Sequence, residues 1–197
     1  MKKIVSLVGM IGAGKTTTIN ALTALGYDTL KEDYIEMSNV LSCDNRMILS
    51  KWAWISNWFY KVEKYFCDNP SSTILFVDRN VIEAGLWTDN CKPLFEPIKL
   101  SLEEFSSRGE YEIVKIYLKC DYAILKDRLK NRLLIEPERL RFNENNPQFI
   151  QSLYQSYIES ESLWNLVIDS HSKSTQQICS AILEYLGVRT VPVIQNT

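Results

Sequence analysis

The first residues whose types and spacing could do chemistry lie near the amino terminus, in the stretch GMIGAGKT. Its spacing, Gly9-x-x-x-x-Gly14-Lys15-Thr16, is that of the P-loop, in which backbone N–H groups converge on phosphate oxygens. In such a loop Gly9, Gly12 and Gly14 would allow the tight turn, Lys15 would reach the β- and γ-phosphates, and the Thr16 hydroxyl would bind Mg²⁺. The alternative is a glycine-rich turn with a solvated lysine. An apolar run before the loop and a helical pattern after it favour the P-loop, so we expect a nucleoside triphosphate to bind here.

A second candidate is the pair Asp78-Arg79, which follows the apolar run TILFV. A carboxylate at the tip of a strand can hold Mg²⁺ directly or through water, and an arginine beside it can contact the transferred phosphate or the acceptor. The alternative is a solvated turn or a helix N-cap at Asp78. We expect the pair to be functional and Asp78 to join Thr16 at the metal.

The acidic stretch Lys31-Glu32-Asp33-Tyr34 follows another strand candidate. A carboxylate here can accept the proton of an acceptor hydroxyl as that hydroxyl attacks phosphorus. Glu32 is the preferred general base and Asp33 the second choice, although an acidic loop before a helix is common in any fold.

Two arginines, Arg128 and Arg132, are four residues apart on a predicted helix over 121–133 and therefore share a face. Guanidinium groups in this position can neutralise charge that spreads over the equatorial oxygens in the transition state. The alternative is an exposed pair of arginines bound to Asp127 or Glu136. We expect both arginines to be catalytic.

The polar segment 136–147 has the composition of a mobile lid. Arg139 and Arg141 lie in it, and a functional and a purely structural role are equally open for both.

Aromatic residues are concentrated in the stretch 52–60, WAWISNWFY. Aromatic residues at helical spacing most often belong to a core. A planar base sandwiched there, with Asn57 or Ser50 reading its edge, is the functional alternative. His171 is expected to be a surface loop residue.

Strands that alternate with helices must position these residues, which predicts an α/β fold: a parallel sheet of about five strands with helices on both faces. Catalytic groups should then gather where the carboxyl ends of the strands meet. The expected strands are 3–8, 27–31, 73–77, 112–118 and 163–168, and the main expected helices are 15–25, 44–67, 121–133 and 175–186.

Composition limits the class of protein. The net charge of -2 gives no surface for a nucleic acid polymer, and no apolar run approaches the length of a membrane span, so we expect no membrane partner and a cytoplasmic location. The five cysteines occur singly, without a CxxC pair, and are expected to be reduced. One domain over 1–187 and a tail over 188–197 are expected.

The order of these motifs resembles the deoxynucleoside kinases, which share their fold with thymidylate kinase. The loop GMIGAGKTT adds Ile11, Ala13 and Thr17 to the nucleotide-binding residues, VDRN carries the acidic-Arg pair, and KDRLKNR carries the lid arginines. The resemblance spans about 3–186 and implies a P-loop kinase fold with a helical lid, ATP and Mg²⁺ as cofactors, and often a homodimer. The chain departs from the family at Asn80, where serine or tyrosine is usual, and at Leu134, where a third arginine is frequent.

Together, the residues and the resemblance predict an ATP- and Mg²⁺-dependent enzyme that phosphorylates the 5′-hydroxyl of a small-molecule acceptor, a nucleoside or deoxynucleoside. A kinase of nucleoside monophosphates, of the thymidylate kinase type, is the close alternative. A regulatory nucleotide-binding protein is a more distant one, since no glycine lies three residues after Asp78.

Overall fold

The protein, described by a computed structural model over residues 1–41, 47–87 and 89–188, is built around one parallel sheet. Its five strands lie in the order β2-β3-β1-β4-β5. The strands are β1 (Lys2–Val8), β2 (Thr29–Leu30), β3 (Ile74–Asp78), β4 (Tyr111–Lys119) and β5 (Leu166–Asp169). The predicted α/β fold is therefore confirmed.

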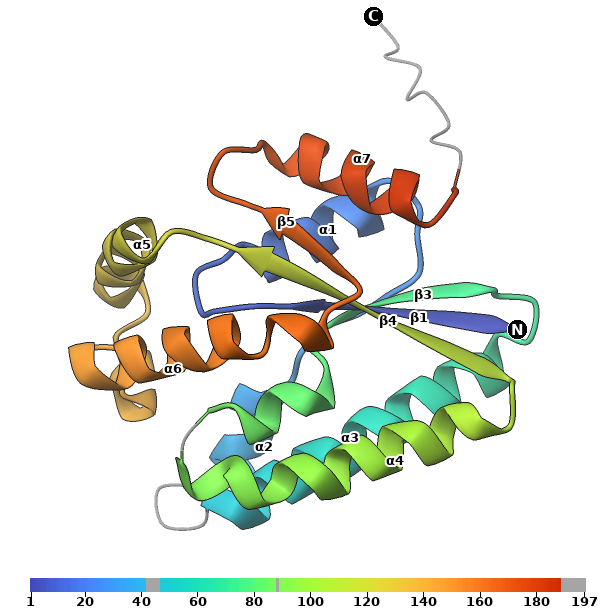
Figure 1. Ribbon diagram of the computed structural model, residues 1–197, viewed down its shortest axis with the longest axis horizontal. Helices are drawn as coiled ribbons and strands as arrows, with labels where there is room; N and C mark the ends of the chain where they lie inside the picture. Colours follow the sequence, from blue (N-terminus) through green and yellow to red (C-terminus); the bar gives the residue numbers. More distant parts are fainter. Residues whose placement is uncertain (42–46, 88, 189–197) are drawn as a thin grey trace, which may run out of the picture.

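Helices cover both faces of the sheet (Figure 1). Helices α1 and α7 lie together on one face, and α3, α4 and α6 lie on the other. The helices are α1 (Lys15–Ala24), α2 (Tyr34–Leu41), α3 (Met47–Asp68), α4 (Phe95–Ser107), α5 (Tyr122–Ile135), α6 (Pro147–Glu159) and α7 (Thr175–Tyr185), with short 3-10 helices η2 (Val81–Gly85), η3 (Asp89–Leu94), η4 (Pro137–Phe142) and η5 (Glu161–Leu163).

The strand order places a topological switch point at β1. After β1 the chain passes through α1 to β2, which lies at one edge of the sheet, and then to β3, beside β1. From β3 it crosses past β1 to β4, in the other half of the sheet. In register, Leu7 of β1 lies beside Asp78 of β3, and Val8 lies beside Tyr117 of β4. The loop after β1 therefore opens into the crevice where ligands bind in folds of this kind.

Some boundaries differ from those expected. The strand predicted over 27–31 is reduced to Thr29–Leu30, because it is an edge strand that pairs with β3 alone. The strand predicted over 163–168 begins at Leu166, because Glu161–Leu163 forms a turn of 3-10 helix. Helix α3 begins at Met47, and residues 44–46 of the predicted helix lie outside the described residues, as does the tail from 189 onward.

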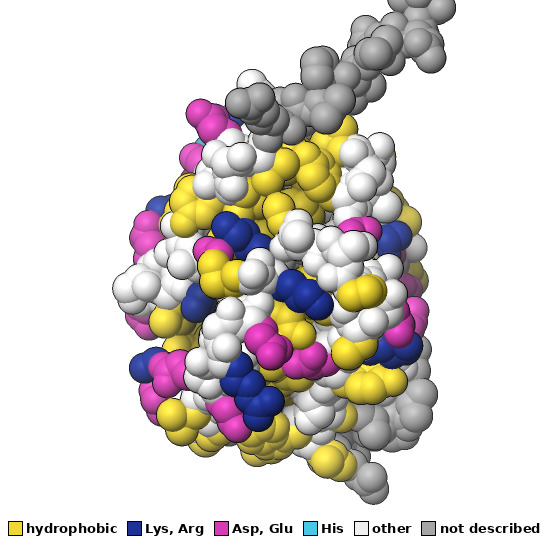
Figure 2. All heavy atoms as spheres, turned by 90° about the vertical axis from the view of Figure 1, so that its right-hand side faces the viewer, with side chains coloured by type: hydrophobic (Ala, Val, Ile, Leu, Met, Phe, Trp, Pro, Cys, Tyr) yellow, Lys and Arg dark blue, Asp and Glu magenta, His cyan; other side chains and the backbone are white. Residues whose placement is uncertain are grey.

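The surface away from the strands' carboxyl ends is mixed in charge. Figure 2 shows Lys and Arg side chains interspersed with Asp and Glu on this face. Within the described residues, no helix has both the length and the apolar character needed to cross a bilayer.

Candidate functional site

The loop between β1 and α1 has the conformation that its glycines predict. The backbone φ angles are 146° at Gly9, 82° at Gly12 and 97° at Gly14, all in the region that other residues rarely adopt. A Cβ atom at Gly9 would lie 2.7 Å from the carbonyl oxygen of Leu118, so this position also lacks space for a side chain. Helix α1 begins at Lys15, directly after the loop, and its first N–H groups are directed at the loop.

Lys15 is buried and folded back onto this loop. Its Nζ donates to the carbonyl oxygens of Gly9, at 2.6 Å, and Met10, at 2.9 Å. Burial, and then the nearby Arg79, lower the pKa of Lys15 from 10.5 to about 8, against the opposing effect of neighbouring carboxylates. The ammonium is therefore held at this loop at an energetic cost, which an anionic ligand would relieve.

This cost gives a prediction for the Lys15→Met variant. Because the folded protein binds the Lys15 proton less tightly than the unfolded chain does, the wild type should gain stability relative to the variant as pH rises from about 8 to 10.5. The gain is at most roughly 3 kcal/mol. Urea unfolding of both proteins at pH 7 and pH 10, without nucleotide, measures it. A difference that does not change with pH would contradict the prediction.

Thr16 and Asp78 are in direct contact, as expected of a metal pair. The Thr16 hydroxyl donates to Asp78 Oδ2 at 2.7 Å. The other carboxylate oxygen, Oδ1, is buried and has no hydrogen-bond partner among the described residues. Glu32 and Glu83, the neighbouring carboxylates, are paired with Arg79. An unpartnered carboxylate oxygen beside a hydroxyl fits a Mg²⁺ ion whose other ligands are phosphate oxygens or water.

Arg79 follows Asp78 and is held in an unusual backbone conformation. Its φ is 78°, which is rare for a residue other than glycine and marks many functional sites. Its Nε lies 3.4 Å from Glu32 Oε2, and its Nη1 lies 3.5 Å from Glu83 Oε1. Burial lowers the pKa of Arg79, but Glu32 and Glu83 raise it by more, so the pKa is raised overall. The guanidinium also lies over the ring of Trp87, 5.1 Å from its centroid.

Both candidate bases, Glu32 and Asp33, line one small cavity together with Asp78. They differ in their partners. Asp33 Oδ2 accepts from Asn57 Nδ2 at 2.8 Å and from Lys61 Nζ at 3.1 Å, whereas Glu32 Oε2 lies 3.4 Å from Nε of Arg79. Glu32 stays the preferred base because it lies beside Arg79, and the Asn57 amide, considered above for reading a nucleobase, is bound to Asp33.

Of the two expected catalytic arginines of α5, only Arg128 reaches the loop. Its Nη1 donates to the carbonyl oxygen of Gly12 at 3.0 Å. Arg132 Nε instead lies 3.2 Å from Glu136 Oε2, the structural alternative considered above. Arg139 binds both Glu136 and Glu144, and its bond to Glu136 lowers the pKa of that carboxyl.

Two features of the site are missing from the sequence-based prediction. One is Glu83, a buried carboxylate that contacts both Gly9 and Arg79. The other is a group of aromatic side chains beside Arg79, in which Lys51 Nζ lies 4.0 Å from the ring centroid of Tyr34 and 4.2 Å from that of Trp87. Asn80-x-x-Glu83 has the spacing of a capping box, which could have signalled the position of Glu83 but not its contacts.

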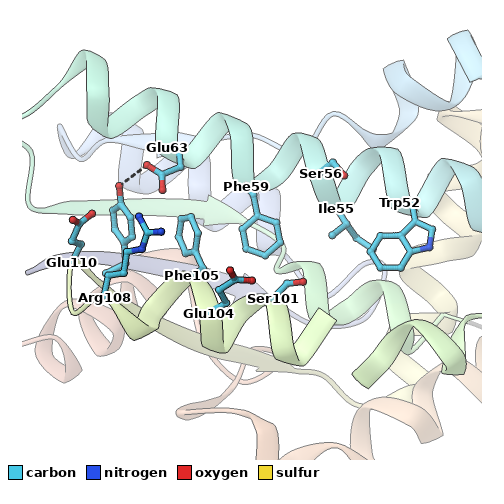
Figure 3. Close-up of a pocket in the computed structure, with 11 residues that line it drawn as sticks. Trp52, Ile55, Ser56, Phe59, Glu63, Ser101, Glu104, Phe105, Arg108 and Glu110 are labelled. Atoms are coloured by element: carbon cyan, nitrogen blue, oxygen red, sulfur yellow. Dashed lines mark hydrogen bonds between the residues drawn. The ribbon is translucent and has the colours of Figure 1, made fainter. Parts of the chain in front are cut away.

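The expectation that the aromatic stretch belongs to the core holds for part of it. Trp54 and Trp58 are buried, whereas Trp52 is exposed and lines a groove between α3 and α4. This groove has a volume of about 410 Å³, and Figure 3 shows Phe59, Phe105 and Trp52 along it. Apart from residues of the aromatic stretch itself, no predicted site residue lines it, so it is separate from the candidate site.

No protein-family model matches the chain, and no curated protein sequence does. Solved structures do. A deoxyadenosine kinase from M. mycoides with bound dATP aligns over 93% of this chain and 99% of that chain, with a TM-score of 0.60 and 16% identity. The same enzyme with bound dCTP gives a TM-score of 0.55 and 18% identity, over 93% and 98% of the two chains. The YorR protein from Bacillus subtilis, in complex with phosphorylated GDP, gives 0.53 and 15%, over 93% and 95%.

At these identities the likeness concerns the fold. The chain has the fold of the deoxynucleoside kinases along nearly its whole length, so the predicted resemblance is confirmed at that level. The roles of individual residues remain predictions that depend on the geometry of the site.

Proposed function

We propose that the protein is a kinase that transfers the γ-phosphoryl group of ATP to the 5′-hydroxyl of a nucleoside or deoxynucleoside. The observation that carries the proposal is that Glu32 lies against Arg79 and lines one cavity with Asp78, beside a P-loop. This arrangement supports the proposal because it would put a base for a hydroxyl and a metal ligand near a triphosphate-binding loop. The shared fold with deoxyadenosine kinases supports the same function.

The donor site consists of the P-loop and α5. The loop N–H groups after Gly9, from Ile11 to Thr17, cradle the phosphates, whereas the Gly9 N–H stays bound to Glu83. Ala13 first gives up its bond to the Met10 carbonyl. Lys15 leaves the Gly9 and Met10 carbonyls to bind the β- and γ-phosphates. Arg128 approaches from α5, and Arg132 joins it if its bond to Glu136 opens. Thr16 and Asp78 would hold Mg²⁺, which supplies charge neutralisation at the phosphates when bound.

The acceptor site consists of Glu32 and Arg79. Glu32 takes the proton of the 5′-hydroxyl while the 5′-oxygen forms a bond to the γ-phosphorus. The bond between that phosphorus and the β,γ-bridging oxygen breaks, and ADP is released. Arg79 orients the reacting oxygen from a backbone that Leu7 and Trp58 fix: its N–H donates to the Leu7 carbonyl at 3.0 Å, and its carbonyl accepts from Trp58 Nε1 at 3.2 Å. Positioning and electrostatics then supply the acceleration.

A screen of acceptors tests this proposal. The purified protein is incubated with ATP, Mg²⁺ and single nucleosides, deoxynucleosides or their monophosphates, and ADP release is measured. We expect ADP release that depends on a nucleoside. Release with monophosphates alone would favour the thymidylate kinase type, and slow release without any acceptor would favour a regulatory nucleotide-binding protein.

The proposal extends to the whole chain. One catalytic domain over 1–187, a cytoplasmic location and a homodimer go with it, the last because kinases that this chain resembles are often dimers. Sedimentation of the purified protein measures the oligomeric state.

A further inference from the structure

Glu83 lies at the centre of a buried polar network. Its side chain, in η2, is fully buried. Oε1 accepts from the N–H of Gly9 at 3.1 Å and from the hydroxyl of Tyr157, and Oε2 accepts from the N–H of Asn80 at 3.1 Å. Arg79 Nη1 lies 3.5 Å from Oε1. One side chain therefore contacts the P-loop, the acceptor arginine and helix α6.

Every partner of Glu83 is a hydrogen-bond donor. Burial, and then Glu83 itself, raise the pKa of the Tyr157 hydroxyl, so this group stays protonated and donates. A carboxylate offers about four acceptor positions and no donor, whereas an amide would turn its NH₂ group toward other N–H groups. The site thus requires a carboxylate, and the cost of burying that charge is offset by these donors, by Arg79 and by the nearby Lys15.

We propose that Glu83 is a positioning residue for the phosphoryl transfer. By binding the first amide of the P-loop and the guanidinium of Arg79, one rigid carboxylate fixes the donor and acceptor ends of the site relative to each other. This inference rests on the proposed function and adds a residue to it.

The two carboxylates around Arg79 differ in a way that supports this division of roles. The Glu83 side chain is 1% exposed, whereas that of Glu32 is 22% exposed. Glu32 can therefore turn toward an acceptor hydroxyl. Glu83 stays in place and holds the Arg79 guanidinium in position when Glu32 moves. Without Glu83, Arg79 would have Glu32 as its main ion-pair partner and would hold the base away from the acceptor.

The isosteric Glu83→Gln variant tests the proposal. We expect kcat to fall about thirtyfold and the affinity for ADP to fall about fivefold, with the acceptor KM changed less than kcat, which are magnitudes typical of lost positioning contacts. Leu153→Ala is the stability control, because Leu153 is buried on α6, near the network, and has no polar side chain. A fall of kcat and ADP affinity in this control equal to that in Glu83→Gln would show that lost stability is the cause, and it would overturn the proposal.

A double-mutant cycle separates positioning from general structural support. If Glu83 acts on catalysis through Arg79, Glu83→Gln should lower kcat much less in an Arg79→Lys background, by about threefold or less, because the forked guanidinium that Glu83 holds is already gone. An equal loss in both backgrounds would overturn the Arg79 part of the proposal. If Glu83→Gln does not fold, Glu83→Asp retains the charge with a shorter reach and takes its place in the cycle.

The outcomes distinguish this inference from the proposed function. If the wild type phosphorylates no nucleoside, the proposed function fails, and the inference is decided by ADP affinity, measured by calorimetry without acceptor. Unchanged ADP affinity in Glu83→Gln would then overturn it. If nucleosides are phosphorylated and Glu83→Gln matches the wild type in kcat and ADP affinity, the inference fails alone.

Discussion

Replacing Lys15 by alanine is expected to lower the rate of ATP-dependent phosphorylation by about a thousandfold or more, while the protein remains folded. Lys15 is buried at the loop and bound to the carbonyls of Gly9 and Met10, from which it can move to the phosphates of a bound nucleotide. Its charge would stabilise the γ-phosphoryl group as that group leaves, when the charge on the bridging oxygen rises. The rate is measured as ADP release at saturating ATP and acceptor.

The fold of this variant should be intact, because the Lys15 ammonium is buried at a cost in free energy, so its removal does not take away a stabilising charge. Circular dichroism and the unfolding midpoint check this. Lys64→Ala is a matched control, since Lys64 is exposed and pairs with Asp68 on the same helix, α3. Full turnover by Lys15→Ala would rule out the proposed mechanism.

Residues that act through local geometry could be predicted from the sequence. The turn from Gly9 to Gly14 depends on backbone angles that only glycine adopts easily, and those angles are present. Asp78 could be placed because a carboxylate at the end of a buried strand must lie at the carboxyl edge of the sheet, where it meets Thr16. In both cases the sequence near the residue determines its position.

Residues that act through distant partners could not be predicted in the same way. Glu83 contacts Gly9 and Tyr157, each 74 positions away in the chain, and no local pattern encodes those contacts. Arg132 has the right spacing from Arg128, but a nearby carboxylate, Glu136, binds it. Helical spacing places two side chains on one face and leaves their partners undecided.

The departure at Asn80 has a structural explanation. Its side chain accepts from the N–H of Ile82 and donates to the hydroxyl of Ser6 on β1, so it caps η2 and joins that turn to the sheet. Asn80 is fully buried. Asn80 therefore has a structural role next to Arg79 in the chain, at the join between β3 and η2.

Replacing Glu32 by glutamine is the second change with a large expected effect. For a nucleoside acceptor, we expect kcat to fall by about a hundredfold to ten-thousandfold, because the amide cannot take the proton of the 5′-hydroxyl. The amide has nearly the same size as the carboxylate, so the cavity that Glu32 shares with Asp78 should keep its shape. Single-turnover rates with saturating ATP and Mg²⁺ separate this chemical step from product release.

The matched control is Asp33→Asn, one residue along the chain. Asp33 is bound to Asn57 and Lys61, so its replacement should disturb the local structure of the loop. The fall in kcat should be far smaller than that caused by Glu32→Gln. A larger loss in Asp33→Asn would make Asp33 the base.

The type of acceptor separates a nucleoside kinase from a monophosphate kinase. A phosphate that is already ionised needs no base, so a monophosphate kinase would keep most of its rate in Glu32→Gln. A variant that loses activity toward nucleosides but retains it toward monophosphates would therefore show that the role of Glu32 lies in proton removal and not in holding Arg79, since Arg79 would be needed for both acceptors.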